Sequence, residues 1–422
     1  MQPCFNIKSV ERKPIAIYVH IPFCVSKCAY CDFYSIPCKL ADKENMAQQP
    51  DLLNGSAVDG IQGCHSLFSD EIYSLQKRYV HALIRQMRIV SRQYRCPRVS
   101  TVFIGGGTPS VLKTEYMQQL IKDLYHCFDI ADDAELTVEV NPDTVDEEKL
   151  SAYKKMGINR LSIGMQSAVD SELRTVSRIH TFESVKAAVK GARAAGFDNV
   201  NLDIMYALPS QTLESFKTTL DAVLSLSPEH VSVYGLQLEE GTPLFKNREN
   251  LAFPGEDAEN EMNALALDIL EKNGYSRYEI SNYAKEGFEC RHNLTYWTQG
   301  EYVGFGVAAH SFKDGKRFSI KKDIEAYCNS LDFSELTETE EILSNEELTD
   351  EYVMLSLRLC RGLSVKELKA LTESAETYLK RAEPFIKSGF MELYTQEGEE
   401  FLHFTHKGFN VSNTVLSEIL NF

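Results

Sequence analysis

The sequence lacks any uninterrupted apolar stretch of the ~20 residues that a membrane-spanning helix requires. Its first residues, Met1 to Val19, carry several charges and lack the apolar centre of a signal peptide. Basic residues are also scarce, because 44 lysines and arginines face 61 aspartates and glutamates, a formal net charge of −17. A surface this acidic repels phosphate backbones and anionic lipid. We therefore expect a cytoplasmic protein that is not an integral membrane protein and binds no nucleic acid.

The eleven cysteines do not form the disulfide framework of a small secreted domain, because their number is odd and the chain has 422 residues. In a reducing compartment, clustered thiols indicate metal binding or catalysis instead. The composition is 43% hydrophobic and 25% charged, which is typical of globular proteins and excludes disorder or a fibrous fold. The length suits two or three domains of ~150 residues each.

The first 240 residues alternate between short β-branched runs and amphipathic helical stretches. Helical periodicity is clear from Ile72 to Val90 and from Val185 to Ala192. Such alternation predicts a parallel sheet with helical crossovers. Each expected strand is followed by polar, cysteine or glycine-rich residues, and chemistry at one end of every strand is typical of a barrel. We therefore predict an α/β fold with a partial (β/α)6 barrel over residues 1–240. The expected strands are Ile15–Ile21, Thr101–Ile104, Leu136–Val140, Arg160–Ile163, Val200–Met205 and Val231–Leu236.

Three further regions follow from the pattern. Residues 39–70 show no clear period and are read as a surface insertion, with an active-site lid as the alternative. Residues 241–340 are predicted to extend the barrel and form a junction. Residues 341–422 combine helical runs with a hairpin that turns at Glu397-Gly398, which predicts an α+β, winged-helix-like cap domain. Acidic residues outnumber basic ones there, which favours a structural or partner-docking cap over a DNA reader.

The most informative segment is Cys24-Val-Ser-Lys-Cys28-Ala-Tyr30-Cys31. Three thiolates within one loop can surround a single metal centre. A structural zinc site usually adds a second CxxC knuckle, and this sequence has none. Three cysteines are instead what a 4Fe–4S cubane needs if one iron is to remain open for a small chelating molecule. We therefore prefer a 4Fe–4S cluster on Cys24, Cys28 and Cys31, with zinc as the alternative.

This CxxxCxxC spacing after the first expected strand resembles the radical S-adenosylmethionine (SAM) superfamily. The resemblance covers roughly residues 14–240 and implies a partial (β/α)6 barrel with the cluster at its mouth. It implies that Tyr30 lies beside the adenine of SAM. Gly105-Gly106-Gly107-Thr108-Pro109 resembles the superfamily's glycine motif, which receives the methionine amino group. Without the resemblance, these glycines would indicate only a tight turn.

Longer motifs resemble the oxygen-independent coproporphyrinogen III oxidase family. They occur in order as Tyr18-Val-His-Ile-Pro-Phe-Cys24, Gly105–Pro109, Glu139-Val-Asn-Pro142, Ser162-Ile-Gly-Met-Gln166-Ser, Arg178-Ile-His180 and Asn201-Leu-Asp203-Ile-Met-Tyr-Ala-Leu-Pro209. The resemblance implies SAM contacts from Tyr18, Gly106, Gly107, Thr108, Glu139, Gln166, Arg178 and Asp203. The residue types suit this role, because Arg178 can pair with a carboxylate, while Glu139 and Asp203 can accept hydrogen bonds from amine or ribose hydroxyl groups.

Two departures separate this sequence from the oxidases themselves. Oxidases continue the cluster motif to CxxxCxxCxC, where this chain has Phe33, and they carry a longer segment before the Tyr-Val-His motif, whereas 17 residues precede Tyr18 here. The Cys31-Asp32-Phe33 ending resembles the HemW-type haem chaperone branch of the family. A second motif also resembles that branch, namely His292-Asn293-Leu-Thr-Tyr296-Trp297, or HNxxYW.

This motif suggests a haem site. His292 could ligate iron through a neutral imidazole, while Tyr296 and the chain's only tryptophan could stack on a porphyrin face. The resemblance thus implies haem contacts by His292, Asn293, Tyr296 and Trp297, and a purely structural role for His292 and Trp297 is the alternative. His20, His180 and His310 lie in other matching segments and remain alternative iron ligands.

The resemblance implies a haem chaperone that carries a 4Fe–4S cluster and exchangeable SAM and passes haem to an acceptor protein. The acidic charge suggests a basic docking partner, such as a membrane-bound respiratory haem enzyme. The alternatives are an oxygen-independent coproporphyrinogen III oxidase and another radical SAM enzyme acting on tetrapyrroles. Whether SAM is cleaved, and whether haem is held covalently, does not follow from the sequence.

Overall fold

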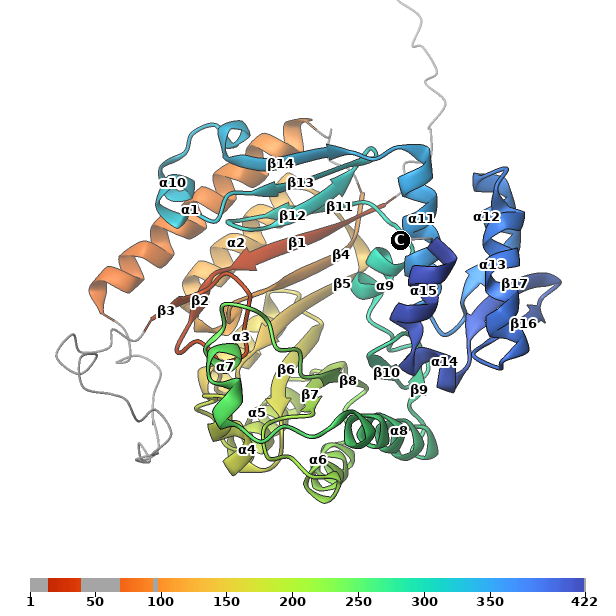
Figure 1. The fold of residues 1–422 in the computed structure, drawn as a ribbon. Coiled ribbons are helices and arrows are strands. Elements are labelled where there is room, and N and C mark those ends of the chain that lie inside the picture. Colours follow the sequence, from red (N-terminus) through yellow and green to blue (C-terminus); the bar gives the residue numbers. More distant parts are fainter. Residues whose placement is uncertain (1–13, 39–68, 94–97, 421–422) are drawn as a thin grey trace, which may run out of the picture.

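The computed structural model describes residues 14–38, 69–93 and 98–420. Its centre is one twelve-stranded sheet in the order β14-β13-β12-β11-β1-β4-β5-β6-β7-β8-β10-β9. Figure 1 shows this sheet running from β14 at the top to β8 below, with the C-terminal helices and hairpin to its right.

The middle of the sheet consists of six parallel strands. They are β1 (Ile15–Ile21), β4 (Arg98–Gly106), β5 (Asp129–Val140), β6 (Arg160–Gln166), β7 (Val200–Tyr206) and β8 (His230–Gly235). Strand β6 is buried along its whole length and β1 at all but one position, as expected for parallel strands covered on both faces. This packing explains why the six segments are nearly continuous apolar runs.

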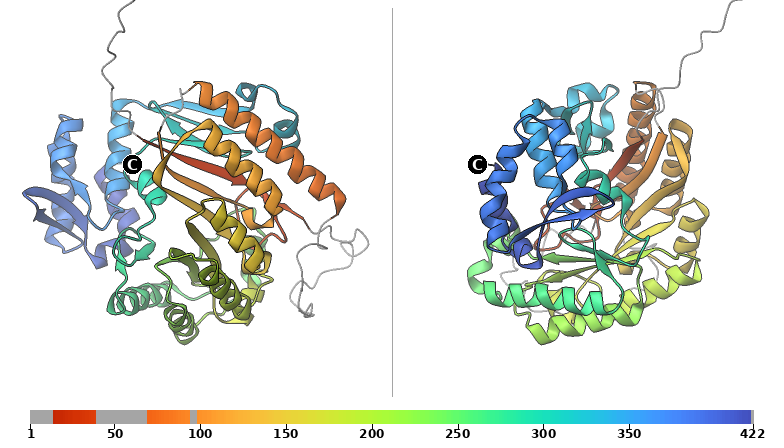
Figure 2. Two further views of the ribbon diagram at one scale, coloured as in Figure 1. Left: turned by 180° about the vertical axis from the view of Figure 1, so that it is seen from behind. Right: turned by 90° about the vertical axis from the view of Figure 1, so that its right-hand side faces the viewer.

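Helices connect these strands and cover the outer side of the curved sheet, as the right-hand view of Figure 2 shows. They are α1 (Asp70–Gln93), α2 (Thr114–Cys127), α3 (Glu147–Lys155), α4 (Asp170–Thr175), α5 (Phe182–Ala194) and α6 (Leu213–Leu226). Thr181 and Thr212 begin α5 and α6 with capping boxes, which satisfy the first free N–H groups of each helix. The capping residues, which can be recognised in the local sequence, therefore determine where α5 and α6 begin.

Later residues extend the sheet at both edges. Strand β10 (Asn282–Ala284) pairs antiparallel with β8, and β9 (Ser276–Arg277) pairs antiparallel with β10. On the other side, β11 (Tyr302–Phe305) pairs parallel with β1. Strands β12 (His310–Lys313), β13 (Lys316–Ile320) and β14 (Thr337–Ile342) complete that side antiparallel. The helices of this part are α7 (Pro243–Lys246), α8 (Glu256–Lys272), α9 (Arg291–Trp297) and α10 (Ile324–Asn329). The first strand is consequently an interior strand of the sheet.

The C-terminal part has its own hydrophobic core, which includes Val353, Leu368, Phe404 and Leu416. Its elements are α11 (Asn345–Ser356), β15 (Leu363–Ser364), α12 (Val365–Leu371), α13 (Ala375–Lys387), β16 (Met391–Gln396), β17 (Glu399–Phe404), α14 (His406–Asn410) and α15 (Ser412–Leu420). The three strands form a small sheet in the order β15-β17-β16. A bridge between Glu279 and Leu359 joins this part to the segment between β9 and β10.

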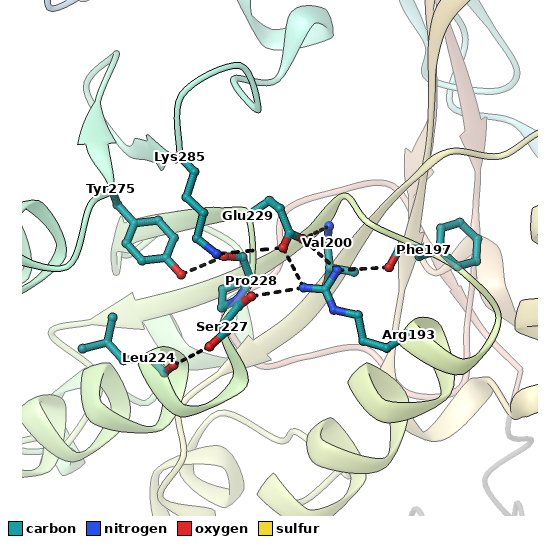
Figure 3. A network of polar contacts seen from close by, with 9 residues as sticks. All are labelled: Arg193, Phe197, Val200, Leu224, Ser227, Pro228, Glu229, Tyr275 and Lys285. Atoms are coloured by element: carbon teal, nitrogen blue, oxygen red, sulfur yellow. Dashed lines mark hydrogen bonds and ion pairs between the residues drawn. The ribbon is translucent and has the colours of Figure 1, made fainter.

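A polar network fixes the start of β8, at the end of the strands opposite the cysteine loop (Figure 3). Glu229 pairs with Arg193 at 2.8 Å and accepts the backbone N–H of Val200 at 3.0 Å. Arg193 also donates to the carbonyl oxygens of Phe197 and Ser227, at 3.0 and 3.1 Å. One carboxylate thus ties the C-terminal end of α5 to the beginnings of β7 and β8.

The predicted architecture of a partial (β/α)6 barrel with a C-terminal α+β cap is confirmed. The strand predicted at Ile15–Ile21 has the bounds of β1, and that predicted at Leu136–Val140 begins earlier, at Asp129. The domain boundaries after residues 240 and 340 stay predictions. Of the expected insertion at 39–70, residues 39–68 lie outside the described residues. No helix within the described ranges combines the length and apolar character needed to cross a bilayer.

Candidate functional site

The cysteine loop follows the first strand. Cys24 ends β2 (Phe23–Cys24), which pairs with β3 (Ile36–Pro37), and Cys28 and Cys31 lie in the loop between these strands. Backbone bonds from Ala29 N to Val176 O at 3.0 Å and from Leu244 N to Ala29 O at 2.9 Å attach the loop to the barrel. The three thiols therefore lie where β1 delivers the chain to the carboxyl-end face of the sheet.

The three thiols sit close enough to influence one another. The pKa of Cys31 is raised to about 11, mainly by burial and in part by the neighbouring Cys28 and Cys24. Burial also raises the pKa of Cys24, whose sulfur accepts a hydrogen bond from the Thr108 hydroxyl at 3.5 Å. All eight cysteines within residues 14–38, 69–93 and 98–420 are free thiols. Within the described residues, no three His, Cys, Asp or Glu side chains come together as a site for a single metal ion. Three free thiols in one loop, near the cation of Arg178, are nevertheless the donor set that a three-cysteine iron–sulfur cluster requires.

The glycine turn after β4 packs directly against the chain that leads to Cys24. The N–H groups of Gly107 and Thr108 donate to Ile21 O and Phe23 O, at 2.8 and 2.7 Å. A Cβ at Gly107 would lie 2.8 Å from both carbonyl oxygens, and Gly106 has φ +109°. Only glycine allows this approach. The turn thereby fixes the cysteine loop beside the end of β4.

Two partly buried carboxyl groups, those of Glu139 and Asp203, lie on β5 and β7. Glu139, near the end of β5, accepts the N–H of Gly106 at 3.0 Å, and its pKa is raised to about 8 by burial and by Asp203. Asp203 in β7 accepts hydrogen bonds from Ser162 at 3.1 Å and from Asn201 at 2.8 Å, and burial raises its pKa as well. Two acids that repel each other in a buried site would be stabilised by a cationic ligand.

Arg178 lies between these acids and the cysteine loop. Its guanidinium donates to the Tyr30 hydroxyl through Nη2 at 3.0 Å and Nε at 3.3 Å, and it lowers the pKa of Glu139. Burial raises the pKa of Tyr30 well above its usual range, so the phenol stays neutral. Arg178 thus orients Tyr30, and its charge can pair with a ligand carboxylate.

Tyr18 lies in β1 and Gln166 ends β6, and strands β4 and β5 lie between them in the sheet. The Tyr18 hydroxyl is 3.1 Å from His20 Nδ1, and its ring stacks on Phe103 with centroids 6.4 Å apart. Gln166 ends β6 with φ 62° and is buried. The structure therefore gathers the predicted SAM residues around the cysteine loop, from the ends of β1, β4, β5, β6 and β7. Their contacts with SAM stay predictions.

The HNxxYW motif forms helix α9, and a residue that the sequence analysis missed holds this helix in place. Glu135 of β5 accepts the N–H groups of Arg291 and His292, at 3.0 and 3.1 Å, and so satisfies the first turn of α9. The signal for Glu135 is a charged residue directly before an apolar strand, but nothing in the sequence indicates its distant partner. The Glu135 side chain therefore attaches α9 to strand β5 of the barrel sheet.

The His292 ring is buried, and a hydroxyl group lies within hydrogen-bonding distance of each of its nitrogens. Its Nδ1 lies 2.9 Å from the Thr101 hydroxyl and its Nε2 lies 2.8 Å from the Tyr296 hydroxyl, and the residue is 1% exposed. Burial lowers its pKa to about 3, so the imidazole is neutral, and the ring stacks on Phe103 with centroids 5.2 Å apart. Because both ring nitrogens are occupied, this arrangement leaves His292 no free nitrogen for iron. The geometry favours the structural alternative for this residue.

The other candidate histidines differ in accessibility. His20 is buried, with its ring nitrogens near Tyr18 OH and Tyr34 O, at 3.1 and 2.8 Å. His180 is buried, and its Nε2 forms a hydrogen bond with Met165 O at 3.1 Å. His310 opens β12 and is exposed. Which of them, if any, ligates iron stays open.

The remaining residues of the motif line a cavity of about 870 Å³. Its wall combines Asn293, Tyr296 and Trp297 with residues from the ends of β7 and β8, from α8, from β9 and β10, and from the C-terminal part. The aromatic and charged members include Tyr206, Tyr234, Glu256, Glu259, Arg277, Glu279, Arg358 and Phe409. This volume lies in the range of ~300–1,000 Å³ that is usual for cofactor sites. Tyr296 connects the cavity to the predicted SAM residues, because its hydroxyl lies 2.8 Å from His292 Nε2 and the His292 ring stacks on Phe103, which in turn stacks on Tyr18.

Comparisons with known proteins relate this chain to one superfamily and to one group of relatives. Residues 18–223 match the Radical SAM superfamily. The chain is 32% identical to the heme chaperone HemW of Lactococcus lactis, over 97% of this chain and 98% of that protein. It is 36% identical to the heme chaperone HemW of Escherichia coli, over 73% of each.

Among solved structures, coproporphyrinogen III oxidase (HemN) from Escherichia coli, a radical SAM enzyme, superposes with a TM-score of 0.76. The superposition covers 96% of this chain and 90% of that chain at 23% identity, which shows a shared fold. Membership of the superfamily implies a 4Fe–4S cluster and SAM. Residues 18–223 therefore form a radical SAM domain, and the chain as a whole belongs to the family of proteins named heme chaperone HemW.

Proposed function

We propose that this protein is a haem chaperone, which binds haem and transfers it to an acceptor protein. The observation that carries the proposal is the cavity lined by Asn293, Tyr296 and Trp297, which adjoins the predicted SAM residues and is large enough for a cofactor. Tyrosine and tryptophan side chains suit one face of a flat, apolar macrocycle. The names of the curated relatives support the same function.

Cys24, Cys28 and Cys31 would hold the 4Fe–4S cluster, and the residues from Tyr18 to Asp203 would hold SAM. When bound, these groups supply an open iron and a sulfonium for one-electron chemistry. The residues of this chain provide the setting. Arg178 is placed to pair with a ligand carboxylate, and Glu139 and Asp203 are placed to accept from an ammonium or from hydroxyl groups.

Phe33 argues against the alternative oxidase activity. Where the oxidases carry a further cysteine, this chain has a phenylalanine that is 68% exposed. For the acceptor, we propose a protein with a basic docking surface, because a net charge of −17 favours association with a positively charged partner.

The test is anaerobic reconstitution with iron and sulfide, followed by haem titration and product analysis on one preparation. We expect a Soret band that saturates at about one haem per chain and no decarboxylation of coproporphyrinogen III in the presence of SAM and a reductant. Protoporphyrinogen formation would instead identify the oxidase. The absence of saturable haem binding would refute the chaperone.

A further inference from the structure

Two arginines from distant parts of the chain meet at the cavity lined by Asn293, Tyr296 and Trp297. Arg277 lies in β9, at the edge of the barrel sheet, and Arg358 follows α11 in the C-terminal part. The bridge between Glu279 and Leu359 and a hydrogen bond from Cys360 N to Tyr278 O at 3.0 Å hold the two segments together. The contact between barrel and C-terminal part thus places two guanidinium groups on one cavity wall.

Arg358 has hydrogen-bonding capacity that the protein leaves unused. Its Nη2 donates to Asn413 Oδ1 at 3.3 Å, but its buried Nε has no hydrogen-bond partner among the described residues. A buried donor on a charged group without a partner is costly. Burial accordingly lowers the pKa of Arg358, against the opposing effect of Glu279. The Nε itself is closed to solvent, so a negatively charged ligand in the cavity would act through the terminal nitrogens of Arg358 and would offset part of the desolvation of its charge.

Arg277 is held in position with its planar group beside an aromatic ring. Its guanidinium donates to the carbonyl oxygens of Glu279 and Ile280 and lies 4.2 Å from the centroid of Phe409. Two carbonyls use only part of the five N–H donors of an arginine. The guanidinium is therefore oriented before any ligand arrives, which reduces the entropy lost when a carboxylate binds.

Three glutamates also line this cavity, and their burial and hydrogen bonds bear on whether a ligand there would be positively or negatively charged. Glu279 is fully buried and accepts hydrogen bonds from Ser281 N at 3.0 Å and from the Asn282 amide, so its charge is satisfied within the protein. Glu256 and Glu259 belong to the first turn of α8 and are the more exposed members. Among the described residues that line this cavity, the positive charge comes from Arg277 and Arg358 alone.

We propose that Arg277 and Arg358 bind the two propionate carboxylates of haem, while Tyr296 and Trp297 contact the macrocycle. This inference rests on the proposed haem-chaperone function and adds the residues that would recognise the acidic edge of the ligand. It also makes the C-terminal part a component of the haem site, because Arg358, Phe409 and Asn413 all line the cavity.

The experiment compares haem with haem dimethyl ester, in which both carboxylates are blocked, by Soret titration of the full chain. The wild-type protein should bind the ester at least about tenfold more weakly than haem, because charge-assisted hydrogen bonds are lost. Arg358→Gln and Arg277→Gln should bind haem at least about tenfold more weakly than the wild type and discriminate less between the two ligands. Arg174→Gln, at an exposed position in α4, is the matched control and should behave like the wild type.

The outcomes separate the two proposals. Saturable haem binding with equal affinity for the ester overturns the propionate assignment but leaves the chaperone intact, and this comparison needs no variant. An arginine variant that loses the same factor for both ligands also overturns the assignment, because its effect is then structural. Arg358→Lys, which keeps the charge, should retain part of the discrimination. Failure of the wild type to bind haem at all overturns the proposed function.

Discussion

His292 allows a sharp test of what the HNxxYW motif does. Replacing it with alanine removes a buried ring that stacks on Phe103 and leaves the hydroxyl groups of Thr101 and Tyr296 without their present partner. Truncation of a large buried side chain costs about 2–5 kcal/mol, and each orphaned polar group costs about 1–3 kcal/mol. Because these terms overlap, we expect the free energy of unfolding to fall by about 3–5 kcal/mol.

Urea denaturation at pH 7.5 measures this loss, and His126→Ala is the matched control. His126 is exposed in the last turn of α2, so its substitution should change the free energy of unfolding by less than about 0.5 kcal/mol. Haem titration of each folded variant completes the comparison. If His292→Ala keeps wild-type stability yet loses the Soret band, His292 is an iron ligand and the structural reading is wrong.

The same residue predicts a pH dependence. Burial lowers the pKa of His292 from 6.5 to about 3, so the unfolded chain takes up a proton below pH 6.5 while the folded chain does not. The stability from this group is therefore complete above pH 6.5 and is lost as pH falls toward 3, by about 1.4 kcal/mol per pH unit. Between pH 6 and pH 5, His292→Ala should lose stability less steeply than the wild type. Equal slopes would contradict the burial argument.

Three other expectations follow. Cys28→Ala should abolish the visible absorption of the reconstituted cluster. Cys38→Ala should retain it, since Cys38 lies outside the CxxxCxxC loop and its thiol donates to Ile36 O at 3.9 Å; equal absorption in both variants would contradict the three-cysteine site. Arg178→Gln should weaken SAM binding about tenfold or more by calorimetry, with exposed Arg174→Gln as control. Glu229→Gln should lower the free energy of unfolding by about 1–3 kcal/mol in urea and leave haem affinity unchanged, because its network lies away from the site.

The sequence predicted the barrel well because local features define it. The six parallel strands are apolar on both faces, so they are visible as short β-branched runs between amphipathic helices. The early start of β5 was missed because Asp129 to Glu135 is rich in charge, which hides a strand from any apolar pattern. The cysteine loop and the glycine turn were found because their chemistry is contained in contiguous motifs.

The parts that escaped prediction depend on contacts between distant residues. Nothing near His292 indicates that Thr101 and Tyr296 will occupy both of its ring nitrogens, or that Glu135 will hold its helix. Likewise, Arg277 and Arg358 belong to no motif and meet only because the C-terminal part packs against β9 and β10. Packing between elements, rather than local preference, decides these roles.

The pairing of β1 with β11 has a consequence for biosynthesis. Ala16 faces Tyr302 across this pair, so the strand that precedes the cysteine loop keeps one unpaired edge until the ribosome has made residues 302–305. At ~5–20 residues per second, that interval lasts roughly 15–60 s, during which an exposed strand edge can pair with another chain. A fragment that ends near residue 240 would keep this edge permanently open. It should therefore aggregate, even though it contains every residue of the cluster loop and of the predicted SAM site.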